Sequence, residues 1–165
     1  MRALLEPTFF NYIYQICSLL EEINFLQGLT TQFLIGLGLS FLAGFVIGLE
    51  RESKGKPAGI STQCLVIGGS MIFSYISGLV DPTSTSRIAA SIVTGIGFLG
   101  AGLILKSEED RKITNLTTAA SVWFSCSIGM AFGFGLFIIG IIGIAFAVLV
   151  ARIPKIQKLG IGHVE

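Results

Sequence analysis

Hydrophobic residues along this chain form five long runs that are separated by short polar segments. Most runs are close to the roughly 20 residues that a helix needs to cross the hydrocarbon core of a bilayer, and the last two are shorter. The connecting segments are short, so consecutive helices are expected to pack as neighbours. The pattern predicts an all-α integral membrane protein with one domain over residues 1–165. Its spans are predicted at residues 31–50, 58–79, 88–105, 117–132 and 136–151.

Residues 8–27, which precede the first span, follow a different pattern. Apolar residues recur there every three or four positions, from Phe9 to Ile23, while polar residues such as Asn11 and Glu22 occupy the opposite face. This periodicity is typical of an amphipathic helix that lies at a membrane surface. We therefore expect an N-terminal interfacial helix that anchors the protein in the lipid of the outer leaflet, with docking of a partner as the alternative.

The composition agrees with a membrane protein, and the charges indicate its orientation. The 165 residues are 52% hydrophobic and 13% charged, whereas soluble domains have about 25% charged residues. The net charge of +1 gives no general attraction to nucleic acid, so no nucleic-acid partner is expected. With alternating crossings, nine lysines and arginines share one side and two fall on the other. The positive-inside rule then places the N-terminus outside and the C-terminus in the cytoplasm.

Glycine clusters mark the faces on which the predicted helices are expected to pack. The segment Gly95–Gly102 contains the letters GxGxxG of a dinucleotide site, but it lies inside an apolar run, which favours helix packing. Small residues let two helix backbones approach closely in lipid. Packing within one chain and packing between subunits both fit the pattern, and we expect a homodimer. The predicted packing positions are Gly44, Gly48, Gly95, Gly97, Gly100, Gly102, Gly129 and Gly133.

Few residues in the chain are suited to carry chemistry. The single histidine, His163, lies near the C-terminal end, and no nucleophile stands beside a base, so we expect neither an enzyme nor a cofactor. The acidic run Glu108–Asp110 is flanked by basic residues and lacks the spacing of metal ligands. We interpret it as a solvated loop and expect no metal site.

Glu50 and Arg51 are ionisable residues that can lie within a span, beside its glycine face. Charged groups at membrane depth need a partner or a water-filled cavity. Thr118 lies at the start of the fourth span, on the same side of the membrane. We predict a polar site formed by Glu50, Arg51 and Thr118 and walled by the glycines of the third span. It would bind a partner helix or a small polar ligand; the alternative is a hydrated charge cluster that ends the first span.

Three segments, Gly48–Ile60, Arg87–Gly102 and Leu116–Gly129, resemble in the expected order the signatures of the MgtC/SapB family of membrane proteins. The resemblance implies a protein of the bacterial inner membrane that is linked to growth at low magnesium and to survival in hosts, and therefore to virulence. For longer members it implies restraint of another membrane complex, the ATP synthase. Because the sequence ends soon after the fifth span, we expect a short form without the soluble C-terminal domain of those members.

These observations favour a non-enzymatic membrane regulator that acts through contacts with membrane partners. The alternative function is a small transporter or channel, in which a broken, glycine-rich third helix lines the path. The spans contain few ionisable groups, which argues against ion conduction.

Overall fold

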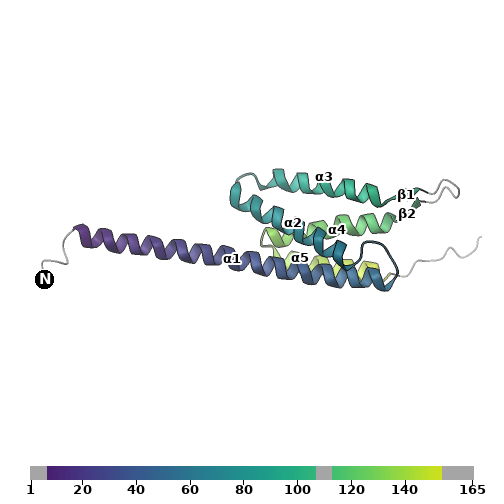
Figure 1. The fold of residues 1–165 in the computed structure, drawn as a ribbon, viewed down its shortest axis with the longest axis horizontal. Helices are drawn as coiled ribbons and strands as arrows, with labels where there is room; N and C mark the ends of the chain where they lie inside the picture. Colours follow the sequence, from purple (N-terminus) through teal and green to yellow (C-terminus); the bar gives the residue numbers. More distant parts are fainter. Residues whose placement is uncertain (1–6, 107–112, 154–165) are drawn as a thin grey trace, which may run out of the picture.

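The computed structural model describes residues 7–106 and 113–153, and over these residues the chain is almost entirely helical (Figure 1). The prediction of an all-α membrane protein is confirmed. Four helices are long and apolar enough to cross a membrane, one of them through its segment Leu26–Ser53, and the last helix is shorter. The elements are α1 (Pro7–Ser53), α2 (Ile60–Val80), α3 (Thr85–Leu103), β1 (Leu105–Lys106), β2 (Ile113–Thr114), α4 (Leu116–Gly133) and α5 (Phe137–Ala151).

Helix α1 continues without a break from residue 7 to residue 53, which differs from the separate interfacial helix and first span predicted from the sequence. No proline lies at the expected junction, and the hydroxyls of Thr30 and Thr31 donate to the carbonyls of Leu26 and Gln27, at 2.9 and 2.8 Å. The helix is therefore unbroken at Gly28. At 1.5 Å per residue its 47 residues measure about 70 Å, and its N-terminal part projects beyond the other helices (Figure 1).

Helix α4 lies at the centre of the bundle and contacts each of the other four helices. Its apolar side chains join those of α1 and α2 in a core formed by Ala43, Ile47, Ile67, Met71, Ile128 and Phe132. The two short strands pair antiparallel, with Leu105 opposite Thr114, and connect α3 to α4. Figure 1 shows this hairpin, the end of α1 and the end of α5 together at one end of the bundle.

Four of the predicted packing glycines lie where helix backbones meet inside the chain. A Cβ atom at Gly44 or Gly48 would overlap the backbone at the start of α2, at Cys64 and Ile60 respectively. A Cβ atom at Gly129 or Gly133 would overlap the carbonyl oxygens of α2 residues Ile67 and Met71. These glycines therefore allow α1 and α4 to pack closely on either side of α2, and their faces are not available to a second subunit.

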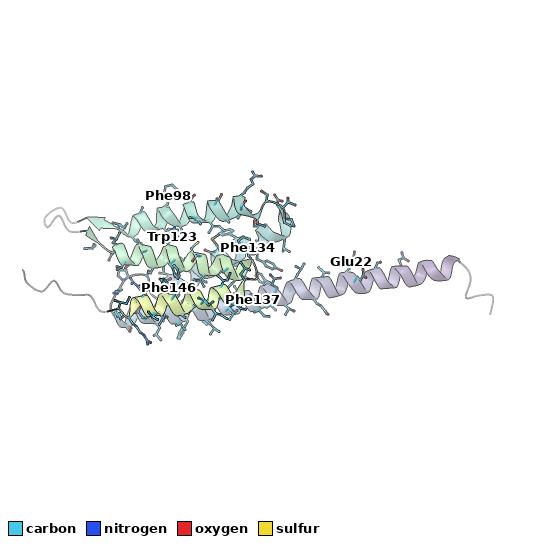
Figure 2. All side chains as sticks on the ribbon, turned by 180° about the vertical axis from the view of Figure 1, so that it is seen from behind. Glu22, Phe98, Trp123, Phe134, Phe137 and Phe146 are labelled. Atoms are coloured by element: carbon cyan, nitrogen blue, oxygen red, sulfur yellow. The ribbon has the colours of Figure 1, made fainter. Side chains whose placement is uncertain are left out.

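Helix α3 stands at the edge of the bundle, and Gly100 is its single buried residue. A Cβ atom at Gly95, Gly97 or Gly102 would meet no atom within 4 Å among the described residues, so these three glycines do not pack helices within the chain. Phe98 stands on the outer side of α3 and is 78% exposed (Figure 2). The third span is one continuous helix with a largely open surface.

Candidate functional site

Arg51 lies in the last turn of α1 and connects three parts of the molecule. Its side chain is 3% exposed, and its guanidinium donates to the hydroxyl of Thr118 in the first turn of α4 and, at 3.3 Å, to the carbonyl of Pro57. The carbonyl of Arg51 accepts from the amides of Lys54 and Lys56, at 3.2 and 3.0 Å. One residue thus fixes the loop after α1 and links it to α4. The structure brings together Arg51 and Thr118 from the predicted site.

Glu50, the third predicted member, points to a different neighbour. It forms an ion pair with Lys54, one turn further along the chain, and the ammonium of Lys54 also donates to the carbonyl of Ala151 at the end of α5. Consecutive side chains on a helix are about 100° apart, so Glu50 and Arg51 serve different faces. Glu50 connects α1 to α5, whereas Arg51 connects α1 to α4.

Glu52, which belongs to the charge cluster that ends the predicted first span, completes the junction. Its carboxylate accepts from the amide of Ile60, at 2.9 Å, and lies against Gly59 at the N-terminus of α2. A negative charge at that end of a helix is favourable because the first amides lack partners there. Glu52 precedes Ile60 by eight residues, beyond the span of any local capping motif, so the sequence pattern could not reveal this contact.

Buried polar residues of α2 also escaped the sequence analysis. Gln63 is fully buried and donates to the carbonyl of Ala58 at 3.3 Å, and Ser70 donates to the carbonyl of Val66 at 2.7 Å. The hydroxyl of Ser70 also lies 3.1 Å from the Cys126 sulfur of α4. Their recurrence on one helix face was the signal that could have identified them. The buried polar residues of α2 are Gln63, Ser70, Ser74 and Ser77.

The groups that accept hydrogen bonds from the Arg51 guanidinium belong to the protein itself, so the role of these bonds is structural: they hold α1, the following loop and α4 together. Among the glycines of α3, Gly95, Gly97 and Gly102 face open space, whereas Gly100 is buried against Ala119 of α4, the residue after Thr118. Over residues 7–106 and 113–153 no three histidine, cysteine or acidic residues gather as a metal site would require. Glu108–Asp110 and His163 lie outside the described residues.

Comparisons with known proteins identify relatives of the chain. It is 41% identical over 134 residues to "Putative magnesium transporter YhiD" of Escherichia coli K12, covering 76% of this chain and 61% of YhiD. It is 39% identical over 143 residues to SrpB of Synechococcus elongatus, covering 74% of this chain and 79% of SrpB.

MgtC of Salmonella typhimurium LT2 is 42% identical over 105 residues, which cover 64% of this chain and 45% of MgtC. The chain thus spans about three fifths of YhiD and under half of MgtC. No solved structure matches it. The model of the MgtC family matches residues 37–158, which include all of the junction around Arg51. The chain belongs to the MgtC family, whose members include magnesium-related membrane proteins.

Proposed function

We propose that this protein is a non-enzymatic regulator in the bacterial inner membrane that supports growth at low magnesium by binding another membrane protein through α3. The observation that carries the proposal is the exposure of α3. This helix is long and apolar enough to span the membrane, and it runs unbroken from Thr85 to Leu103, yet it buries only Gly100. The membership of the MgtC family supports the link to magnesium.

The open surface of α3 has the composition of a helix-docking face. Ala90, Thr94, Gly97 and Ala101 recur at spacings of four and three residues, and all four are exposed. Residues at these spacings lie on one side of a helix. Small residues allow close backbone approach in lipid, where packing rather than hydrophobicity drives helix association. The ATP synthase and a second copy of this chain are the candidate partners.

Transport is the second candidate function, because the name of YhiD describes a magnesium transporter. A transport path through the third span would use a discontinuous helix with free backbone groups, and α3 is continuous. This argues for the regulator. Magnesium uptake by proteoliposomes that contain only the purified protein separates the two functions: uptake above that of empty vesicles would establish a transporter.

A leucine at Gly97 is expected to abolish the support of growth at low magnesium. The larger side chain would prevent close approach of a partner to α3, while nothing within 4 Å opposes it in the free protein. The measurement is growth of a deletion strain that carries the variant, at low and at ample magnesium, with membrane accumulation checked by immunoblot. Gly38→Leu is the matched control, since Gly38 is also exposed with open space around it, on α1. Equal growth of the two variants would refute docking through α3.

The orientation of the protein is expected to follow its basic residues, with the loop after α1 in the cytoplasm. Two cysteines introduced into a background without native cysteines test this, Ser53→Cys at the end of α1 and Thr83→Cys in the α2–α3 connection, both at exposed positions. A membrane-impermeant maleimide should label Thr83→Cys in intact cells and Ser53→Cys only after lysis. The reverse pattern would invert the proposed orientation.

A further inference from the structure

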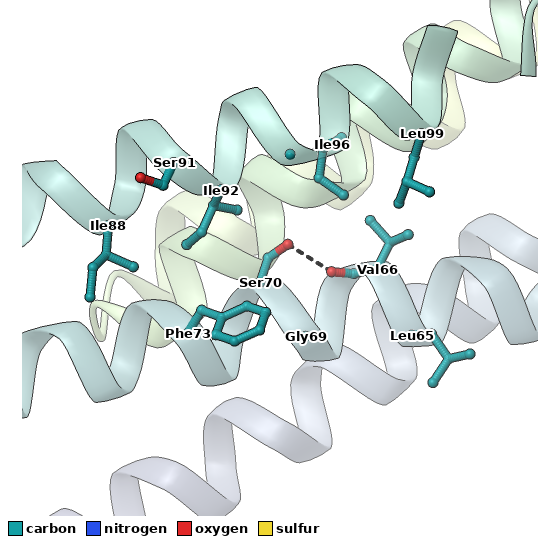
Figure 3. Close-up of a pocket in the computed structure, with 11 residues that line it drawn as sticks. Leu65, Val66, Gly69, Ser70, Phe73, Ile88, Ser91, Ile92, Ile96 and Leu99 are labelled. Atoms are coloured by element: carbon teal, nitrogen blue, oxygen red, sulfur yellow. Dashed lines mark hydrogen bonds between the residues drawn. The ribbon is translucent and has the colours of Figure 1, made fainter. Parts of the chain in front are cut away.

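An apolar groove lies between α2 and α3. It has a volume of about 470 Å³ and is lined by α2 between Leu65 and Phe73 and by α3 between Ile88 and Leu99. Figure 3 shows Ile92 and Ile96 pointing from α3 toward α2 across this space. The groove opens on the side of the bundle, between two helices that span the membrane.

The lining of the groove excludes a polar ligand. Its side chains are apolar apart from two serines. The hydroxyl of Ser70 donates to the carbonyl of Val66 at 2.7 Å, and that of Ser91 donates to the carbonyl of Arg87 at 3.1 Å. Both donors are therefore used within their own helices, and a polar molecule would lose its hydrogen bonds with water or headgroups on entering.

The length and the apolar lining of the groove suit an extended hydrocarbon chain. Eleven residue steps along α3 separate Ile88 from Leu99, which makes the groove about 17 Å long.

A positive charge lies at one end of the groove. Arg87 is in the first turn of α3, one helical turn before the lining residue Ser91, and it lies beside this edge of the groove. It is exposed, and among the described residues no carboxylate pairs with its side chain. A guanidinium at the end of a membrane helix reaches the headgroup level and binds phosphate through charge-assisted hydrogen bonds.

We propose that this groove is a phospholipid site, in which one acyl chain lies between α2 and α3 and the lipid phosphate is bound by Arg87. An apolar groove about 17 Å long and an unpaired arginine beside its end match the two parts of such a lipid. The bound chain fills the space that α2 and α3 leave between them. The groove residues of α3 lie on a different side of the helix from Gly97, and the site does not depend on the proposed regulatory function.

The site is tested with the full-length protein in vesicles of phosphatidylethanolamine and phosphatidylglycerol that contain a trace of phosphatidylglycerol with a photoreactive diazirine in one acyl chain. After irradiation, mass spectrometry should find the label on α2 and α3 residues of the groove, such as Phe73 and Ile92. Gly95→Leu should lower this labelling about tenfold, because its side chain takes the place of the acyl chain. Gly97→Leu, on the same helix and outside the groove, should leave it unchanged.

Arg87→Gln should lower the labelling about fivefold through loss of the phosphate contact, whereas Arg152→Gln, an exposed arginine at the end of α5, should not change it. Both glycine variants have open space around the new Cβ atom, and thermal unfolding would verify that each is folded. Equal labelling of Gly95→Leu and Gly97→Leu would show ordinary contact with bulk lipid and overturn the site. Full labelling of Arg87→Gln would overturn the phosphate contact. Both results are independent of growth at low magnesium.

Discussion

Gly129→Ala is expected to lower the free energy of unfolding by about 2–3 kcal/mol, the scale of overpacking in a tightly packed core. A single methyl group at this position would overlap the carbonyl oxygen of Ile67, which belongs to the backbone of α2 and cannot turn away. Helices α2 and α4 would have to separate, and α4 contacts every other helix of the bundle. The measurement is unfolding in mixed micelles of dodecylmaltoside and sodium dodecyl sulfate, followed by circular dichroism.

Gly68→Ala is the matched control for this prediction. Gly68 lies one residue from Ile67 in α2, and a Cβ atom there meets nothing within 4 Å. Because alanine favours a helix over glycine by about 1 kcal/mol, this variant should be as stable as the original protein or slightly more stable. If Gly129→Ala also proved neutral, α2 and α4 would not be in the close contact described above.

The fold class could be predicted from the sequence because a membrane span is read from length and apolarity alone. The same pattern could not show which glycine faces are packed. A face against another helix and a face against lipid are both apolar, so Gly97 and Gly129 look alike in the sequence. They differ in the structure, where Gly129 meets the backbone of α2 and Gly97 meets open space.

The junction at the end of α1 shows the same division between what a sequence reveals and what it does not. Arg51 and Thr118 could be predicted as neighbours because alternating spans place both at the same end of the bundle. The pairing of Glu50 with Lys54 follows an i,i+4 spacing that is visible in the sequence, whereas the contact of Glu52 with the amide of Ile60 depends on the path of the loop after α1. No short-range pattern fixes this second contact.

The continuity of α1 was missed for a local reason. Gly28 and two threonines resemble a loop in composition, but both threonine hydroxyls donate to carbonyls four residues earlier. A threonine that binds its own helix in this way is compatible with helix in an apolar setting. The amphipathic pattern of residues 8–27 therefore belongs to the N-terminal part of one long helix.

Arg51→Gln is expected to destabilise the protein by about 3 kcal/mol, because hydrogen bonds from a charged group contribute about 1.5–3 kcal/mol each and glutamine cannot reach both acceptors. The bonds to Thr118 and to the carbonyl of Pro57 would be lost from a site that is 3% exposed. Amide hydrogen exchange should accelerate in the loop between α1 and α2, which Arg51 holds. Arg51→Lys should also be destabilised, because the single nitrogen Nη2 donates to both acceptors and the lysine side chain, one atom shorter, does not place its ammonium there.

A double-mutant cycle isolates the contact between Arg51 and Thr118. Arg51→Gln, Thr118→Val and the double variant should show a coupling of about 1–3 kcal/mol, the range found for residues in one hydrogen-bond network. Ser53→Ala is the control, because Ser53 is exposed and its hydroxyl donates only to the carbonyl of Glu50 in its own helix. The contact would hold α1 and α4 together at the basic end of the bundle. Its loss should therefore reduce the amount of folded protein and, as a consequence, impair growth at low magnesium. Additive effects in the cycle would show that Arg51 and Thr118 contribute independently to stability and would refute the hydrogen bond between them.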